Sequence, residues 1–222
     1  MLLRAAILLL LASTAAAAAN PWPRDTEGTF ISVTEDFGDL EEDTETRLFI
    51  ESGAGKTGPS IGVSSVVDSD GDAWTAFAFV RQPLSSSGAR DQFALSAGIG
   101  AQQTQTGSTE PLVVLGGAWG RGVDGLVNGW LSLEGEARYA TDTGETELQG
   151  DATIAVSPID QISLVNELSL TGVPGSDVDA DAQLTSSIVG NITDQARIQL
   201  GATVDLSGDT ATGFRLGTWL EF

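Results

Sequence analysis

Residues 213–222 have the sequence GFRLGTWLEF, and this stretch decides the fold. Successive side chains of a strand point to opposite faces. The two faces of this segment differ in polarity, with Phe214, Leu216, Leu220 and Phe222 on one and Arg215, Gly217, Trp219 and Glu221 on the other. A tilted strand of about ten residues is long enough to cross a bilayer. The segment therefore predicts a strand with one face suited to hydrocarbon and one suited to water.

The same alternation recurs along the chain, in short segments separated by clusters of Gly, Asp, Ser, Thr and Pro that favour turns. Helical periodicity is not evident after the first 19 residues. The fold class that this pattern predicts is all-β, as a single antiparallel up-and-down transmembrane β-barrel of about 12 strands. The predicted strands are residues 29–34, 46–52, 60–67, 73–81, 92–102, 112–119, 129–139, 148–156, 161–170, 178–189, 197–206 and 213–222.

The N-terminal segment predicts export. Residues 1–19 contain one positive charge, at Arg4, then an apolar run at residues 5–12 and a stretch of small residues at 14–19. That order is typical of a secretory signal peptide. A membrane anchor needs roughly 18 to 20 strongly apolar residues, and this run is much shorter. We therefore expect a signal peptide at residues 1–19 and one barrel domain at residues 20–222.

With a signal peptide, alternating strands and a terminal Phe222, the chain resembles bacterial outer-membrane β-barrel proteins. No specific member is identified. The resemblance implies Sec-type export, residence in the cell outer membrane among its lipids, and recognition of the C-terminal strand, with Phe222 as assembly signal, by the barrel-assembly machinery. We also expect the last strand to close on residues 29–34.

Composition excludes several functions. The chain has 31 acidic and 10 basic residues, a net charge of −21, so nucleic acid is not an expected partner. It contains no cysteine and no histidine, which removes thiolate chemistry, Ser-His-Asp triads and the usual zinc sites. We predict no enzymatic activity, no cofactor and no metal.

The connections between the predicted strands differ in charge. In a barrel whose termini share one side, odd-numbered connections face one way and even-numbered ones the other. Three of the five even connections carry a cation, namely Lys56, Arg90 and Arg121, whereas the six odd ones carry none. This asymmetry favours a two-sided barrel with the even turns in the periplasm.

Two short motifs have simpler interpretations. Residues 51–57 (ESGAGKT) resemble a P-loop, but Ile50 stands where the first glycine belongs and no helix follows, so a turn is predicted. Residues 68–72 (DSDGD) space carboxylates like a calcium loop, but lack the glycine and glutamate that such a loop requires. A solvated acidic loop is favoured over loose binding of a divalent cation.

The candidate site is the set of charged residues on the water-facing sides of the strands. In a narrow barrel some of these must form ion pairs, and the excess of carboxylates favours cations if a water path remains. The candidates that line the lumen are Glu134, Glu136, Arg138, Asp151, Glu167, Asp179, Asp181, Arg197, Asp205 and Arg215, with Arg47, Glu51 and Glu221 on the same faces.

Two classes of function are open at this point. The favoured one is a non-enzymatic barrel that acts as a small passive pore or uptake channel, with an acidic, weakly cation-preferring lumen and small solutes or cations as its partners. The alternative is a secreted or periplasmic all-β protein, lipocalin-like or sandwich-like, that binds a ligand or partner. The weak aromatic girdle, with a single tyrosine, keeps this alternative open.

Overall fold

A computed structural model describes residues 28–38, 44–53, 58–86, 88–103, 107–125, 128–176, 180–207 and 212–222, all of them in strands, turns and short connections. No helix within these ranges is long and apolar enough to cross a membrane. The strands are β1 (Thr29–Phe37), β2 (Thr44–Gly53), β3 (Ser60–Asp68), β4 (Trp74–Pro83), β5 (Asp91–Gln103), β6 (Thr109–Val123), β7 (Asn128–Ala140), β8 (Thr146–Ile159), β9 (Ile162–Gly172), β10 (Asp181–Asn191), β11 (Ala196–Asp205) and β12 (Thr212–Glu221).

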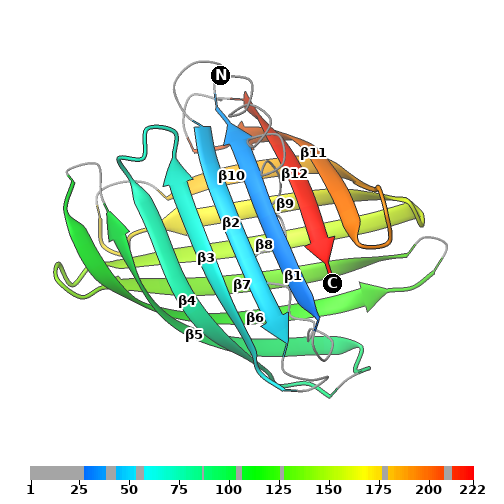
Figure 1. Cartoon of the computed structure of the whole chain (residues 1–222), viewed down its shortest axis with the longest axis horizontal. Helices are drawn as coiled ribbons and strands as arrows, with labels where there is room; N and C mark the ends of the chain where they lie inside the picture. Colours follow the sequence, from blue (N-terminus) through cyan, green and yellow to red (C-terminus); the bar gives the residue numbers. More distant parts are fainter. Residues whose placement is uncertain are drawn as a thin grey trace.

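The strands form one closed antiparallel barrel in which every strand pairs with its neighbours in sequence and β12 pairs with β1 (Figure 1). The seam is fully hydrogen-bonded, because Thr29 N donates to Phe222 O at 3.0 Å and Phe222 N donates to Thr29 O at 2.9 Å. The predicted fold class and the predicted closure of the last strand on the first are both confirmed. A β-sandwich is excluded, since the sheet has no open edge.

We call the end of the barrel that carries Thr29 and Phe222 the turn end, and the opposite end the loop end. Several strands extend further than the sequence predicted, so residues assigned to connections lie in strands. Asp36 and Glu45, predicted in the first loop, belong to β1 and β2. Arg121, predicted in a turn, belongs to β6 and pairs with Asp91 at 2.6 Å. Charged side chains favour connections, so the predicted strands ended before these residues.

The outer face of the barrel is an apolar belt. Along β5 the outward side chains run from Phe93 through Leu95 and Ile99, and Ile99 is 72% exposed. The outward run from Phe93 to Ala101 covers about 27 Å along the strand, or about 20 Å along the axis at the usual tilt. Such a belt matches the hydrocarbon-facing band of an outer-membrane barrel, which is about 25 Å tall.

Polar and aromatic side chains border this belt at both ends. At the turn end, the Trp119 indole donates to Asp91 at 3.1 Å beside Arg121. At the loop end, Tyr139 is 45% exposed. Tyrosine and tryptophan favour the boundary between hydrocarbon and water, because each has an apolar ring and one polar group.

The barrel interior contains an aromatic cluster, which we define as Phe30, Phe49, Phe77, Phe79 and Trp219. All five side chains are buried. Phe49 stacks on Phe79 with a centroid distance of 5.5 Å, and Phe30 bridges Phe49 and Trp219 edge-on at 6.2 and 6.4 Å. One wall of the interior is therefore packed like the core of a soluble protein.

Candidate functional site: the barrel interior

The loop end opens into a vestibule of about 590 Å³. Its charged lining contains more carboxylates than arginines, namely Glu45, Asp68, Glu145, Glu147 and Asp181 against Arg47 and Arg138. Both arginines are paired with carboxylates, Arg47 with Glu45 and Arg138 with Glu147 at 2.9 Å. Carboxylates therefore outnumber arginines among the described residues that line the vestibule.

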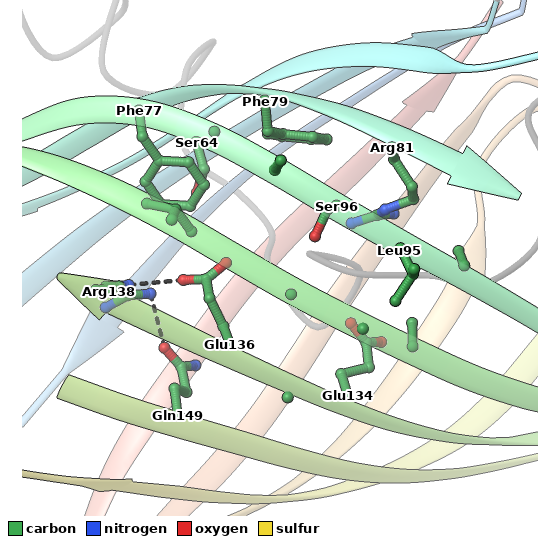
Figure 2. Close-up of a pocket in the computed structure, with 18 of the residues that line it drawn as sticks. Ser64, Phe77, Phe79, Arg81, Leu95, Ser96, Glu134, Glu136, Arg138 and Gln149 are labelled. Carbon is green, nitrogen blue, oxygen red and sulfur yellow. Dashed lines mark hydrogen bonds and ion pairs between the residues drawn. The ribbon is translucent and has the colours of Figure 1, made fainter. Parts of the chain in front are cut away.

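Below the vestibule the interior narrows to a second cavity of about 70 Å³, which has room for only a few water molecules. Figure 2 shows its two sides: Phe77, Phe79 and Arg81 line one, and Glu134 and Glu136 line the other. We call this space the inner cavity.

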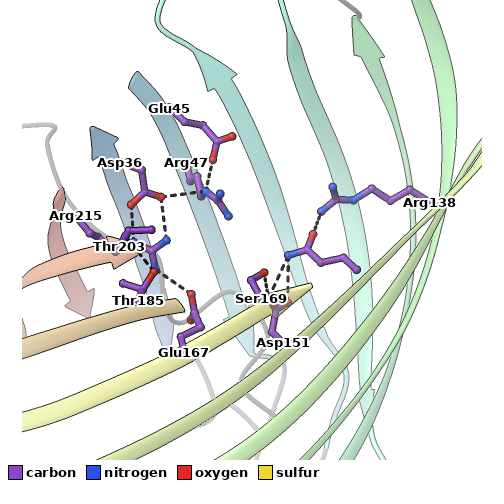
Figure 3. Close-up of polar contacts among 11 residues, drawn as sticks. Asp36, Glu45, Arg47, Arg138, Asp151, Glu167, Ser169, Thr185, Thr203 and Arg215 are labelled. Carbon is purple, nitrogen blue, oxygen red and sulfur yellow. Dashed lines mark hydrogen bonds and ion pairs between the residues drawn. The ribbon is translucent and has the colours of Figure 1, made fainter. Parts of the chain in front are cut away.

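An ion-pair network crosses the barrel beside these cavities (Figure 3). Arg215 of β12 donates to both carboxylate oxygens of Asp36 on β1, at 2.6 and 3.0 Å, and to Glu167 on β9 at 2.9 Å. Asp36 also pairs with Arg47 at 3.4 Å. The Arg215 side chain is only 1% exposed, so its charge depends on these partners rather than on water.

Small side chains allow Arg215 to reach Glu167 over two intervening strands. On β11 it passes Gly201, where an added Cβ would lie 3.3 Å from the Arg215 Cβ and 2.4 Å from the Ser187 hydroxyl. Thr185 and Thr203 hydrogen-bond to each other at 3.1 Å, which satisfies two buried hydroxyls in the same region. A bulky residue at these inward positions would block the contact.

A second network involves Arg138 of β7, which donates to Glu136 at 2.6 Å, Glu147 at 2.9 Å and Gln149 at 2.7 Å. Gln149 in turn donates to Asp151 at 3.1 Å, and Asp151 also accepts a hydrogen bond from Ser169. The network links three adjacent strands, β7, β8 and β9, and fixes the arginine at the junction of the two cavities.

Towards the turn end, Arg81 lies against the aromatic cluster. Its guanidinium is 5.3 Å from the centre of the Phe79 ring and 6.0 Å from that of Phe49, and it pairs with Glu51 at 3.4 Å. Glu51 also accepts a hydrogen bond from Ser60. Aromatic faces and a carboxylate together stabilise this nearly buried cation.

The structure brings five of the ten sequence-predicted candidates into these networks: Glu136, Arg138, Asp151, Glu167 and Arg215. Glu134 lines the inner cavity. Arg197 lies at the turn end, where it pairs with Glu221 at 3.5 Å, and Asp181 and Asp205 lie at the loop end, where both accept hydrogen bonds from Ser207. Asp179 lies outside the described residues.

Sequence reasoning missed Arg81, Asp36 and the four phenylalanines of the aromatic cluster. The signal was present in the alternation, since Phe49 lies between Arg47 and Glu51 on the same face of β2, and Phe79 precedes Arg81 by two residues on β4. Trp219 was placed on the same face as Arg215 in the sequence analysis, whereas the phenylalanines were not assigned to the interior.

Within the described ranges, no group of three or more acidic residues is arranged to hold a metal ion. In the acidic segment at residues 68–72, Asp68 accepts a hydrogen bond from the Ala73 backbone at 3.0 Å and Gly71 has a φ of 74°, as a tight turn requires. The P-loop-like segment connects β2 to β3, and its residues 54–57 lie outside the described residues.

Comparison with solved structures identifies the fold. The KdgM porin in complex with disordered oligogalacturonate matches with a TM-score of 0.59 and 12% identity over 87% of this chain and 99% of that chain. The NanC porin matches with a TM-score of 0.60 and 10% identity over 86% and 98%. The chain has the fold of small outer-membrane porins. No protein-family model and no curated protein sequence matches the chain.

Proposed function

We propose that the protein is a narrow outer-membrane channel that admits small cations in preference to anions. The observation that carries this proposal is the charge balance of the interior. The arginines that line the described part of the interior (Arg47, Arg81, Arg138, Arg197 and Arg215) are each paired with a carboxylate, and the vestibule retains an excess of carboxylates. A cation entering from the loop end meets a net negative field, whereas an anion is repelled.

The same balance distinguishes this interior from one suited to acidic sugars. Oligogalacturonate, which is bound by the KdgM porin, is a polyanion. An arginine that already donates its hydrogen bonds to carboxylates, as Arg138 and Arg215 do, has little capacity left for a second anion. Small cations and small neutral polar solutes are therefore the substrates that we assign to this barrel.

The apolar belt and its borders support a location in the outer membrane. We infer that residues 1–19 direct Sec-type export and are removed, and that the barrel-assembly machinery recognises the C-terminal strand with Phe222. The Phe222 side chain is 60% exposed, so it is accessible to a partner as well as to lipid. The lipocalin-like alternative loses its support, because a secreted barrel would not expose a continuous apolar belt to water.

Conductance of the refolded protein in planar bilayers tests this function. We expect current in symmetric potassium chloride, and a larger fall in current when potassium is replaced by a bulky organic cation than when chloride is replaced by a bulky organic anion. Heat-modifiable migration on a gel confirms folding of the sample. Folded protein that inserts but carries no current, or whose current depends mainly on the anion, would overturn the proposal.

A further inference from the structure

The barrel interior is filled unevenly around its circumference. On the side of β1, β11 and β12, the inward side chains Ser32, Thr34, Gln199 and Arg215 are at most 2% exposed. The Gln199 side chain lies flat across Gly217 of the neighbouring strand, where an added Cβ would be 2.5 Å from the Gln199 Cβ. This wall leaves no space for a passing solute.

The opposite wall carries less side-chain bulk, because most of its inward residues at the inner cavity are glycine, alanine or serine. Where β5 and β6 line the inner cavity, their inward positions are Ala94, Ser96 and Gly98 on β5 and Val114, Gly116 and Ala118 on β6. The remaining space in the barrel therefore lies against β5 and β6, between the aromatic side chains of β4 and the carboxylates of β7 (Figure 2).

This space continues upward into the vestibule. Phe49, Ser64, Arg138 and Gln149 line both cavities, so the two meet at this set of four side chains, which we call the neck. The Phe49 ring and the Arg138 guanidinium are each held by other contacts, Phe49 by its stack on Phe79 and Arg138 by its three hydrogen bonds. The neck is thus preorganised rather than formed by loose side chains.

Glu134 differs from the other carboxylates that line the inner cavity. Glu136 is paired with Arg138, and Asp151 accepts hydrogen bonds from Gln149 and Ser169. Glu134 makes no hydrogen bond or ion pair with any residue that the structure describes, although its carboxylate projects into the cavity from β7 (Figure 2). Arg81 across the cavity is already paired with Glu51.

We propose that solutes pass along the wall formed by β5 and β6, and that Glu134 determines the charge preference of this passage. A carboxylate that makes no hydrogen bond or ion pair with the described residues, in a space this small, is compensated by a mobile cation or by water. The substrate class that fits is a monovalent cation of the size of potassium or ammonium with part of its water shell. This inference deepens the proposed function and rests on it.

Replacement of Glu134 by glutamine tests the role of the charge. A unit charge about 4 Å from a passing ion contributes about 1 kcal/mol in a water-like environment, so Glu134→Gln should lower the cation-to-anion permeability ratio about fivefold. Asp194→Asn is the matched control, because it removes the same charge from an exposed turn between β10 and β11. The control should leave the ratio unchanged, since salt screens a charge in open water.

Substitution of a small side chain by a larger one tests the position of the passage separately. Ala118→Leu adds three carbon atoms to the β6 wall of the inner cavity, and we expect it to reduce conductance at least threefold. Ala202→Leu adds the same bulk to an exposed position of β11 and should leave conductance unchanged.

The outcomes separate the two proposals. A wild-type protein without cation-preferring current contradicts the proposed function itself. A cation-preferring wild type whose ratio is the same in Glu134→Gln, or changes as much in Asp194→Asn, overturns the role of Glu134. An unchanged conductance in a folded Ala118→Leu variant overturns the assigned passage.

Discussion

Replacement of Arg215 by methionine should strongly destabilise the barrel. The Arg215 guanidinium makes two hydrogen bonds to Asp36 and one to Glu167, and its side chain is 1% exposed. Removal of one partner from a buried ion pair costs about 3–5 kcal/mol, because the other charge is left buried without compensation. We expect a loss of this size in the free energy of unfolding.

The two partners of Arg215 should respond differently. Asp36 keeps Arg47 at 3.4 Å, whereas Glu167 loses its one ion pair within the described part of the chain. The second substitution Glu167→Gln in the Arg215→Met background should therefore restore about 1–3 kcal/mol, as a coupling energy in a double-mutant cycle. Urea unfolding in lipid vesicles, followed by tryptophan fluorescence, measures all four proteins.

Arg197→Met is the matched control. Arg197 pairs with Glu221 at 3.5 Å, but the two side chains are 39% and 55% exposed. Exposed ion pairs contribute less than about 1 kcal/mol, so the control should lose little. The reasoning is refuted if Arg215→Met loses no more than Arg197→Met, or if Glu167→Gln gives no recovery.

Three further predictions concern packing and assembly. Gly100→Ala should destabilise the barrel by at least about 2 kcal/mol, because the added Cβ would lie 2.1 Å from a carbonyl oxygen of β4. Gly135 has open space around it, so Gly135→Ala should be tolerated in the same unfolding assay. Phe222→Ala should leave the stability of refolded protein within about 1 kcal/mol but lower its amount in outer membranes, as quantified by immunoblotting of fractions; equal amounts of both proteins would contradict an assembly role. Phe49→Ala should lower the free energy of unfolding by about 3–5 kcal/mol, because the stack on Phe79 is lost. It should also raise single-channel conductance at least twofold, because the neck becomes wider. An unchanged conductance would place the constriction elsewhere.

The sequence was sufficient for the architecture because alternation is a local property of each strand. Twelve strands and closure through residues 213–222 follow from period-two polarity and an even strand number. The same alternation indicated which charged residues lie on the same face of a strand. On β7, for example, it put Arg138 on the face of Glu136 and Ala140.

The contacts between those residues were not accessible from the sequence. The pair Arg215–Asp36 joins residues 179 positions apart, and Arg215 reaches Glu167 across two strands only because β10 and β11 carry small inward side chains there. The uneven filling of the interior is also a property of the closed barrel, since it depends on aromatic side chains of β1, β2, β4 and β12 meeting on one side. Strand ends were misplaced where a charged residue such as Asp36 or Arg121 continued the strand.

The reversal potential of the wild-type protein in a planar bilayer, with a tenfold gradient of potassium chloride, tests the central claim most directly. The proposed cation preference, based on the excess of carboxylates over arginines in the vestibule lining, predicts a reversal potential shifted towards the equilibrium potential of potassium. A reversal potential near zero, or one shifted towards that of chloride, would contradict a cation-preferring channel.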